Sequence, residues 1–321
     1  MSAPVFVIAH RGACGYRPEH SRSAYELACA LGADAVEPDV VMSRDGVLVV
    51  RHENELSGTT DVASRAEFAS RRRRAVVDGV PLTGWFTEDF TWDELSTLHC
   101  AEPMPTIRPE NTRVEPEKLL RLADVLGIVA AAANLVKTVV ELKHGTYFDQ
   151  LGLPLDDALA RELELAGWAR DDERLILESF ELDVLQRCRS AGVGASHVYL
   201  MDTDGIAPDQ LARLGKGAPG YAAQREPAQL AALALAVDGI SIPVDLLMSE
   251  EGRDTLDRAH ALGMTVYTFT LRPENRFLPE ECQVGADPSA WGNWQGHFDA
   301  VVATGVDGVF ADHPDLVLAR Q

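Results

Sequence analysis

Short apolar runs alternate with amphipathic segments along most of the chain. Eight of these runs have the length of buried strands, and they lie at residues 5–9, 35–41, 138–142, 175–179, 197–200, 239–242, 265–270 and 307–311. Five segments between them show helical spacing of apolar residues and end in glycine, at residues 23–32, 115–127, 157–167, 182–192 and 253–263. Strands that alternate with helices predict a parallel sheet that is covered on both faces.

A closed eight-stranded barrel is the commonest way to bury a parallel sheet on both faces, so we predict a (β/α)8 TIM barrel. The chain has 321 residues, a length that α/β barrels reach as one domain, and we expect residues 1–321 to form a single domain. An open doubly wound sheet is the alternative. It is less favoured because the first strand lacks the glycine-rich turn of a dinucleotide-binding fold.

The apolar run VLVV at residues 47–50 breaks the alternation. Only the five residues MSRDG separate it from the second strand, which is too few for a crossover helix, whereas Asp45-Gly46 is typical of a hairpin turn. We therefore predict a return strand that is antiparallel to the second barrel strand, with the turn centred directly before Asp45.

The register of this hairpin brings charged residues together. With the turn so placed, Glu37 lies opposite His52, and Asp39 lies opposite Val50. Side chains two residues apart in a strand share a face, so Glu37, Asp39 and His52 are expected to converge. Glu141 on the neighbouring barrel strand adds a third carboxylate to the same place.

The segment from residue 53 to residue 115 shows no alternation of strands and helices. It contains the basic run RRRR at residues 71–74 and four aromatic residues, Trp85, Phe86, Phe90 and Trp92. We interpret it as an insertion after the second strand that covers the active-site end of the barrel, because a structureless loop of this length is unusual. The basic run is expected to be a solvent-exposed face of this insertion.

The charge balance argues against nucleic acid as a partner. The chain has 29 Lys and Arg residues against 50 Asp and Glu residues, a formal net charge of −21, which repels nucleic acid and anionic lipid. No apolar run approaches the roughly 20 residues of a membrane span, so no stable membrane association is expected. The partner we expect is a small molecule, and the oligomeric state is left open.

The cysteines and the amino-terminal sequence indicate in which cellular compartment the protein is expected. The five cysteines are scattered, with neither a CxxC pair nor the Cys/His spacing of a zinc site, which is typical of reduced thiols in a cytoplasmic protein. The amino-terminal sequence MSAPVFVIAH has no basic region, and its apolar run is too short for a signal peptide. We expect a cytoplasmic protein, or a periplasmic or secreted one if a leader has been removed.

Polar side chains stand at the carboxyl ends of several predicted strands, where the active sites of α/β barrels lie. They are His10 and Arg11 after the first strand, Glu37 and Asp39 in the second, Glu141 and Lys143 after the third, and Asp312 and His313 after the eighth. Three carboxylates at one place repel one another unless protons or a cation intervene. A set of oxygen ligands without thiolates selects a hard cation, Ca²⁺ or Mg²⁺, over zinc.

The residues around this cation fit phosphate-ester chemistry. His10 and His52 suit general acid and base catalysis near neutral pH, and Arg11 and Lys143 are cationic donors for an anionic group. Structural roles are the alternatives: Arg11 pairs with a carboxylate, Lys143 extends to solvent, or Glu141 pairs with Lys143 instead of a cation. Five other histidines are expected to be structural, namely His20, His99, His144, His260 and His297.

Ordered motifs span nearly the whole chain. They are HRG at residues 10–12, EPD at 37–39, RHE at 51–53, VVELKHGTYF at 139–148, ESFELDVLQR at 178–187, AHALGMTVYTFTLRPENRFLP at 259–279 and GVDGVFADHPD at 305–315. The set resembles the glycerophosphodiester phosphodiesterase family. Within this family, the chain resembles most the branch typified by periplasmic bacterial enzymes. The features that carry this likeness are the PEH, TTDV and LRPENRFLP segments and the long insertion.

This resemblance implies a TIM-barrel hydrolase that converts glycerophosphodiesters to glycerol 3-phosphate and an alcohol. By position it implies His10 and His52 as the acid–base pair, Glu37, Asp39 and Glu141 as ligands of one divalent cation, and Arg11 and Lys143 as phosphate binders. The branch favours Ca²⁺, with Mg²⁺ as the alternative, and the insertion helps to hold the glycerol moiety.

Departures from the family pattern concern the substrate. Glu53 stands where an Asp often follows the second catalytic histidine, Phe269 stands where many relatives carry Trp, and Ala311-Asp312-His313 replaces a common Thr-Asp-Phe. We expect Phe180, Phe269 and Trp85 to contact the substrate. Two alternatives remain: a phosphodiesterase that acts on lysophospholipids or another diester, and a non-catalytic binder of anionic ligands.

Overall fold

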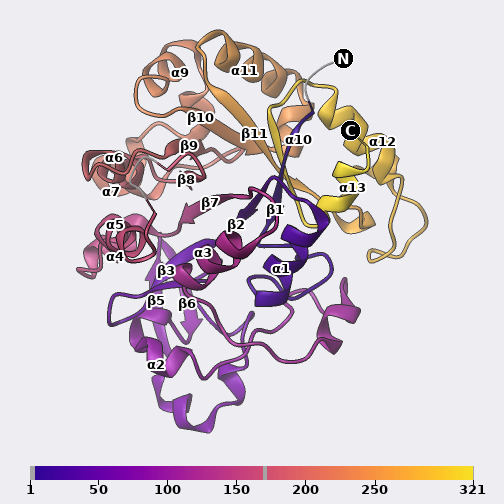
Figure 1. Cartoon of the computed structure of the whole chain (residues 1–321). Helices are drawn as coiled ribbons and strands as arrows, with labels where there is room; N and C mark the ends of the chain where they lie inside the picture. The colour runs from indigo at the N-terminus through magenta and orange to yellow at the C-terminus, as the bar shows by residue number, and fades with distance from the viewer. Residues whose placement is uncertain (1–3, 169–171, 321) are drawn as a thin grey trace.

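The computed structural model describes residues 4–168 and 172–320, and its centre is a closed barrel of parallel strands (Figure 1). The barrel strands are β1 (Phe6–His10), β2 (Ala35–Glu37), β3 (Asp39–Met42), β7 (Lys137–Leu142), β8 (Leu175–Ser179), β9 (Ser196–Leu200), β10 (Gly239–Pro243), β11 (Thr265–Leu271) and β12 (Gly308–Ala311). Their order is β2-β1-β12-β11-β10-β9-β8-β7-β3, and a pairing of β2 with β7 closes the ring. With β2 and β3 counted as one interrupted strand, the barrel has eight strands, and the predicted TIM barrel is confirmed.

Helices connect the barrel strands and cover the outside of the barrel (Figure 1). They are α1 (Arg22–Leu31), α3 (Leu122–Ala131), α4 (Gly145–Gln150), α5 (Leu155–Leu165), α6 (Leu182–Ser190), α7 (Pro208–Leu214), α8 (Tyr221–Gln224), α9 (Pro227–Leu233), α10 (Val244–Met248), α11 (Glu250–Ala261), α12 (Trp294–Val302) and α13 (Pro314–Leu318). Four of the five predicted helices correspond to α1, α5, α6 and α11. In α1 the Ser21 side chain caps the first turn, and Gly32 ends the helix at φ 87°.

The fifth predicted helix, at residues 115–127, is wrong at both ends, because α3 begins at Leu122 and continues through Gly127. The residues before α3 are extended because their backbone has partners elsewhere. The N–H of Val50 donates to the carbonyl of Leu120 at 2.9 Å, and the N–H of Cys100 donates to that of Glu117 at 2.8 Å. These tertiary pairings outweigh the local helical pattern.

Pro38 divides the second barrel strand between two charged residues. Proline has no N–H for the strand ladder, so the strand is split into β2 and β3. The Pro38 carbonyl still accepts a hydrogen bond from the N–H of Glu141 at 3.0 Å. β2 pairs with β1 and β7, while β3 pairs with β7 and with β4 (Leu48–Val50). Glu37 and Asp39 therefore lie on either side of this break.

The antiparallel return strand is confirmed as β4, but its predicted register is wrong by one residue. Asp39 lies opposite Arg51, whose N–H donates to the Asp39 carbonyl at 3.0 Å, and His52 falls opposite Pro38. The reason is the loop, which contains three residues instead of two. Its third residue, Gly46, has φ 79°, the left-handed conformation that a three-residue hairpin loop requires.

Two layers of side chains fill the barrel, because residues two apart in a strand share a face. The inner layer is apolar and consists of Ile8, Ala35, Val139, Ile176, Val198, Tyr267 and Phe310. Two positions further along the same strands follow His10, Glu37, Glu141, Glu178, Leu200, Phe269 and Asp312. The apolar layer thus forms a floor inside the barrel, and the second layer lies at the mouth, at the carboxyl ends of the strands.

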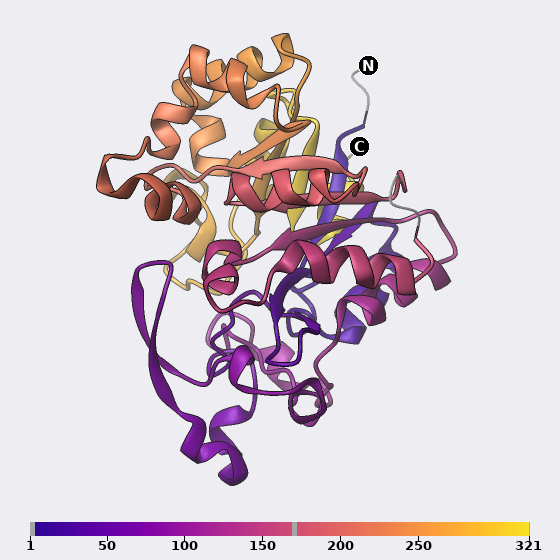
Figure 2. The same ribbon diagram turned by 90° about the vertical axis from the view of Figure 1, so that its left-hand side faces the viewer.

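The part of the segment between β4 and β7 that precedes α3, residues 51–121, lies outside the repeating pattern (Figure 2). It holds a hairpin of β5 (Arg73–Val77) and β6 (Val80–Gly84), the short helix α2 (Trp92–Leu95) and several 3-10 turns. Asp78 at the hairpin turn contacts His144 after β7, and Arg108 contacts Asp312 after β12 at 2.6 Å. The segment therefore touches the carboxyl ends of the strands at two places, and its role as a lid or wall stays a prediction.

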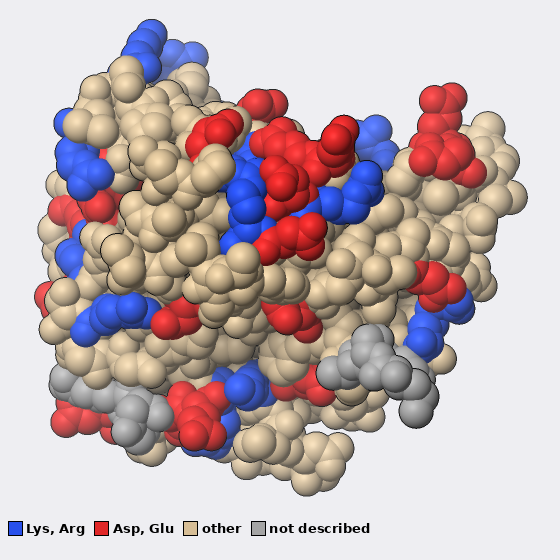
Figure 3. All heavy atoms as spheres, turned by 90° about the horizontal axis from the view of Figure 1, so that it is seen from above, with Lys and Arg blue, Asp and Glu red and all other residues tan. Residues whose placement is uncertain are grey.

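Acidic and basic side chains lie next to one another on the face drawn in Figure 3. In the basic run at residues 71–74, Arg71 pairs with Glu94 and Arg73 pairs with Glu88. Part of this run is therefore neutralised by acids of the same segment. Across residues 4–168 and 172–320, no helix has the length and the apolar character that crossing a membrane requires.

Candidate active site

A cavity of about 250 Å³ opens at the mouth of the barrel. Its walls are formed by His10, Arg11, Glu37, His52, Glu141, Glu178, Phe180, Leu200, Phe269, Thr270, Arg272 and Phe310. Residues predicted from distant parts of the sequence as acid–base, cation-binding, phosphate-binding and substrate-binding groups thus share one space. Their separate roles stay predictions at this point.

Three carboxylates converge beside the cavity. Glu37, Asp39 and Glu141 are buried, and each places an oxygen within 4.8 Å of the other two. Glu37 Oε1 and Asp39 Oδ1 have no hydrogen-bond partner, which is costly for buried carboxylates unless a cation binds them. Burial and the charge of Asp39 raise the pKa of Glu37 well above its usual range, as expected for a carboxyl group that is buried beside other carboxyl groups. This all-oxygen set fits a hard divalent cation.

Two cationic side chains border these carboxylates. Arg11 Nη1 lies 2.8 Å from Glu19, and Arg11 Nε lies 3.2 Å from Asp39. Lys143 Nζ lies 3.0 Å from Glu141 Oε1. The carboxylate pair that is the structural alternative for Arg11 is therefore present, as is the Glu141–Lys143 pair that is the alternative for Glu141. Lys143 is buried and does not extend to solvent. Arg11 also lines the cavity, whereas Lys143 is not among the residues that line it.

The backbone of the HRG motif is shaped by its glycine. Arg11 and Gly12 have φ values of 56° and 81°, and a Cβ on Gly12 would lie 2.7 Å from the backbone of Ala24 in α1. Only glycine fits this close approach. The turn directs the N–H of Arg11 to Glu37 Oε2 at 2.8 Å, so the motif also orients one of the candidate cation ligands.

His10 is held by a buried network of ion pairs. Its Nδ1 lies 2.7 Å from Asp312 Oδ1, while Asp312 Oδ2 accepts from Arg108 at 2.6 Å and from Arg272 at 2.7 Å. Although burial alone would raise it, the two arginines hold the pKa of Asp312 well below its usual range. Burial and the charge of Arg11 lower the pKa of His10 to about 4. His10 is therefore neutral near pH 7 and donates its Nδ1–H to Asp312, which leaves Nε2 as a base.

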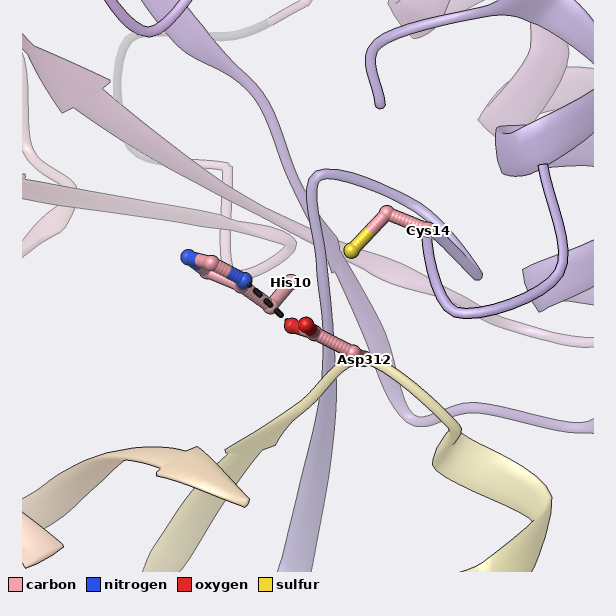
Figure 4. A group of neighbouring side chains, drawn as sticks. All are labelled: His10, Cys14 and Asp312. Carbon is pink, nitrogen blue, oxygen red and sulfur yellow. Dashed lines mark hydrogen bonds and ion pairs between the residues drawn. The ribbon is translucent and has the colours of Figure 1, made fainter. Parts of the chain in front are cut away.

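Cys14 lies beside this pair (Figure 4). The ligand atoms of His10, Cys14 and Asp312 lie within 4.8 Å of one another. Arg108 already occupies the place of a cation here, because its Nη1 lies 3.2 Å from the Cys14 carbonyl and 3.7 Å from Sγ. Burial also raises the pKa of the Cys14 thiol well above its usual range, which disfavours a thiolate ligand. This group is better explained by the arginine than by a metal ion.

His52 reaches the cavity although its strand partner differs from the predicted one. Its Nδ1 lies 3.0 Å from Glu53 Oε1, Glu53 Oε2 lies 3.2 Å from His144 Nε2, and His144 Nδ1 lies 2.5 Å from Asp78. Burial and nearby positive charges lower the pKa of His52 to about 4. Against the effect of burial, hydrogen bonds to Asp78 and Glu53 raise the pKa of His144 to about 9. The long Glu53 side chain thus bridges two histidines.

The predicted substrate-contacting aromatics divide into two groups. Phe180 and Phe269 line the cavity and face each other edge to face, with ring centroids 5.9 Å apart. Trp85 is not among the residues that line it. Its ring is buried in the segment between β4 and β7, where its indole N–H donates to the Phe68 carbonyl at 2.7 Å. The structure therefore does not bring Trp85 to the site.

Some residues of the site were missed or ranked low in the sequence. Glu178 had a signal, since it is a charge at the end of the buried run LILES, as Glu37 is in its own strand. Asp312 stands after the eighth predicted strand, but the sequence assigns it no role, and Arg108 had no signal because its segment lacks periodicity. His20, for which we expect a structural role, is buried, and its Nε2 lies 2.9 Å from Asp39 Oδ2.

Comparison with known proteins identifies the family. A sequence model of the glycerophosphoryl diester phosphodiesterase family matches residues 10–316. The chain belongs to this family. The phosphodiesterase is 28% identical over 324 residues to glycerophosphodiester phosphodiesterase GDPD6 of Arabidopsis thaliana, which covers 95% of this chain and 82% of the relative. It is 40% identical over 196 residues to a glycerophosphodiester phosphodiesterase of Treponema pallidum, 57% of this chain and 52% of the relative.

Solved structures share the fold of this phosphodiesterase. A phosphodiesterase of Oleispira antarctica, in complex with the product sn-glycerol-3-phosphate, superposes with a TM-score of 0.62 at 19% identity, covering 98% of this chain and 95% of that one. A glycerophosphodiester phosphodiesterase of Thermotoga maritima superposes with a TM-score of 0.60 at 18% identity, covering 100% of both chains. The family predicted from the motifs is thus confirmed, while the periplasmic-type branch stays a prediction.

Proposed function

We propose that this enzyme hydrolyses glycerophosphodiesters to glycerol 3-phosphate and an alcohol with one divalent cation. The observation that carries the proposal is the meeting of three buried carboxylates, two of them with unpartnered oxygens, and two imidazoles at one cavity. The similarity to glycerophosphodiester phosphodiesterases supports this class of substrate. The product bound in the Oleispira antarctica structure is consistent with it.

Glu37, Asp39 and Glu141 hold the cation in this proposal. A cation bound there polarises a phosphoryl oxygen and offsets developing negative charge. The oxygen ligands suit Ca²⁺, which we propose as the preferred ion, with Mg²⁺ as the alternative. Arg11 and Lys143 donate hydrogen bonds to the remaining phosphoryl oxygens, and their charges favour binding of the anionic diester.

His10 and His52 carry the protons. Each ring has Nδ1 on a carboxylate, Asp312 or Glu53, which leaves each Nε2 for the substrate. One histidine removes the proton of the attacking oxygen, and the other protonates the leaving alcohol. The lowered pKa values make both rings neutral bases before substrate binds. The negative charge of the diester then favours protonation of the ring that acts as the acid.

The walls of the cavity determine which diester enters. Phe180 and Phe269 offer apolar surface to the carbon chain of the substrate, and we retain both as substrate-contacting residues. Trp85 supports the fold of its own segment in this proposal. A lysophospholipid, or another diester that the cavity admits, is the alternative substrate, because the same acid–base and cation-binding groups serve any phosphodiester.

Release of glycerol 3-phosphate from glycerophosphocholine tests the proposal. We expect turnover with Ca²⁺ or Mg²⁺, loss of turnover after chelation, and a decrease in kcat of about 10²- to 10⁴-fold in His10→Ala. His260→Ala is the matched control, since His260 pairs with Asp307 at the surface, and it keeps wild-type activity. Activity that survives both chelation and His10→Ala contradicts the mechanism. A faster rate on lysophosphatidylcholine favours the alternative substrate.

The expected compartment and partners remain proposals. We propose a cytoplasmic enzyme whose partner is a small molecule, with neither nucleic acid nor a stable membrane association. The net charge of −21 supports the exclusion of polyanions. Fractionation of cells that produce the native protein, followed by detection of the chain in each fraction, checks the location.

A further inference from the structure

Glu178 at the end of β8 has no role in the proposed reaction, although it lies in the same cavity. Its side chain is 1% exposed, and its Oε2 has no hydrogen-bond partner. A buried polar group that lacks a partner costs about 1–3 kcal/mol, and such groups in native proteins call for an explanation. A ligand that enters the cavity and forms the missing hydrogen bond provides one.

Glu178 lies beside the predicted ligands of the cation but is not one of the three carboxylates that converge. It is the neighbour of Glu141 in the parallel register, yet the oxygens that converge within 4.8 Å belong to Glu37, Asp39 and Glu141. Its direction follows from strand geometry, because Ile176 two residues earlier lies in the apolar floor inside the barrel. The carboxyl therefore points into the cavity above this floor.

The surroundings of Glu178 restrict what it can bind. The side chains of Phe180, directly after β8, and Leu200, the last residue of β9, line the cavity and offer no hydrogen bond to a hydroxyl group. Arg272, another polar residue of the cavity wall, already has a partner in Asp312. A substrate hydroxyl on this side of the cavity thus finds its acceptor in Glu178.

We propose that Glu178 binds a hydroxyl group of the glycerol unit and thereby selects glycerol diesters over diesters that lack this hydroxyl. This inference rests on the proposed function. A glycerol unit esterified to a phosphate at the cation site carries two hydroxyls close to that phosphate. A site built around a buried hydrogen-bonding group rejects an analogue without the hydroxyl, because the group is then left unpaired.

Three phosphocholine diesters test this specificity. The first carries a glycerol unit. The second carries a 3-hydroxypropyl group and so lacks the secondary hydroxyl, and the third carries a 2-hydroxypropyl group and so lacks the terminal hydroxyl. The wild-type enzyme is expected to favour the glycerol diester over at least one analogue by about 10- to 100-fold in kcat/KM. In Glu178→Leu, kcat/KM for the glycerol diester is expected to fall by about this factor because KM rises. For the disfavoured analogue, kcat/KM is expected to fall by at most about threefold.

Two further variants separate binding from folding. Glu178→Gln keeps the hydrogen-bonding group, and it is expected to retain most of the discrimination between diesters. Thr138→Val is the matched control, since Thr138 Oγ1 is also buried and unpartnered, on β7, but does not line the cavity. This control keeps the wild-type discrimination.

Three outcomes overturn the inference. The first is a wild-type enzyme that turns over all three diesters equally well, and the second is a Glu178→Leu variant that loses the same factor on each of them. The third is a decrease in Ca²⁺ affinity of more than about tenfold in Glu178→Leu by calorimetry, which assigns the carboxylate to the cation site. A wild-type enzyme that turns over none of the diesters contradicts the proposed function instead.

Discussion

Arg108 joins the segment between β4 and β7 to the barrel, and Arg108→Leu is predicted to lower the free energy of unfolding strongly. The side chain is 4% exposed. Its Nε lies 2.7 Å from Glu274 Oε1, its Nη2 lies 2.6 Å from Asp312, and its Nη1 lies 3.2 Å from the Cys14 carbonyl. The substitution removes all three interactions, while the leucine side chain fills most of the space of the apolar part of the arginine.

The magnitude follows from what each partner retains. Asp312 keeps Arg272 and His10, so its charge stays compensated. Glu274 is 3% exposed, and its Oε2 already lacks a partner, so the loss of Arg108 leaves a buried carboxylate without its paired cation. Removal of one member of a buried pair costs about 3–5 kcal/mol. This is a large share of the roughly 5–15 kcal/mol by which domains are stable.

Urea unfolding measures this cost. Arg113→Leu is the matched control, because Arg113 forms a pair with Glu110 whose side chains are 71% and 75% exposed, and it is expected to cost about 0–1 kcal/mol. The double variant Arg108→Leu/Glu274→Leu removes the unpaired charge and is expected to be more stable than Arg108→Leu alone. A cost below about 1 kcal/mol for Arg108→Leu, or strict additivity of the two substitutions, refutes the reasoning.

Two further predictions concern the cation site and the contact with the hairpin turn. Glu141→Gln is expected to weaken Ca²⁺ binding by at least about tenfold in calorimetry, because it removes a charged ligand; unchanged affinity would make Glu141 a structural partner of Lys143. His144→Gln is expected to destabilise the protein by up to about 3 kcal/mol at pH 6, since the pKa of His144 rises from 6.5 to about 9 on folding. This contribution is complete below pH 6.5 and is lost as the pH rises through 9, so unfolding curves of wild type and variant should converge near pH 10.

The strands and most helices of the barrel could be predicted because their signals are local. An apolar run such as LILES at residues 175–179, or the capped helix that ends at Gly32, carries its own pattern of burial and termination. The candidate site was largely predictable for a related reason. In a barrel every strand brings its last residues to the same mouth, so the charged ends of separate runs had to meet.

Other features depend on long-range contacts that no local pattern encodes. The helix expected at residues 115–127 begins late because its first residues are hydrogen-bonded to Val50 in β4 and to Cys100. Trp85 is a large aromatic residue of the kind that lines pockets, but its ring packs inside the segment between β4 and β7. Arg108 lies in a region without periodicity, and its importance is visible only in its contacts with Glu274 and Asp312.

The sequence by itself determined the barrel, the family and the chemical groups at the mouth, because these follow from strand periodicity, motifs and the common direction of parallel strands. The tertiary structure decided the partners of those groups. Gly46 shifts the hairpin by one residue, yet His52 still reaches the cavity, where Glu53 orients it as Asp312 orients His10. The partner of a buried charge is set by packing between distant segments, and local sequence carries no record of that packing.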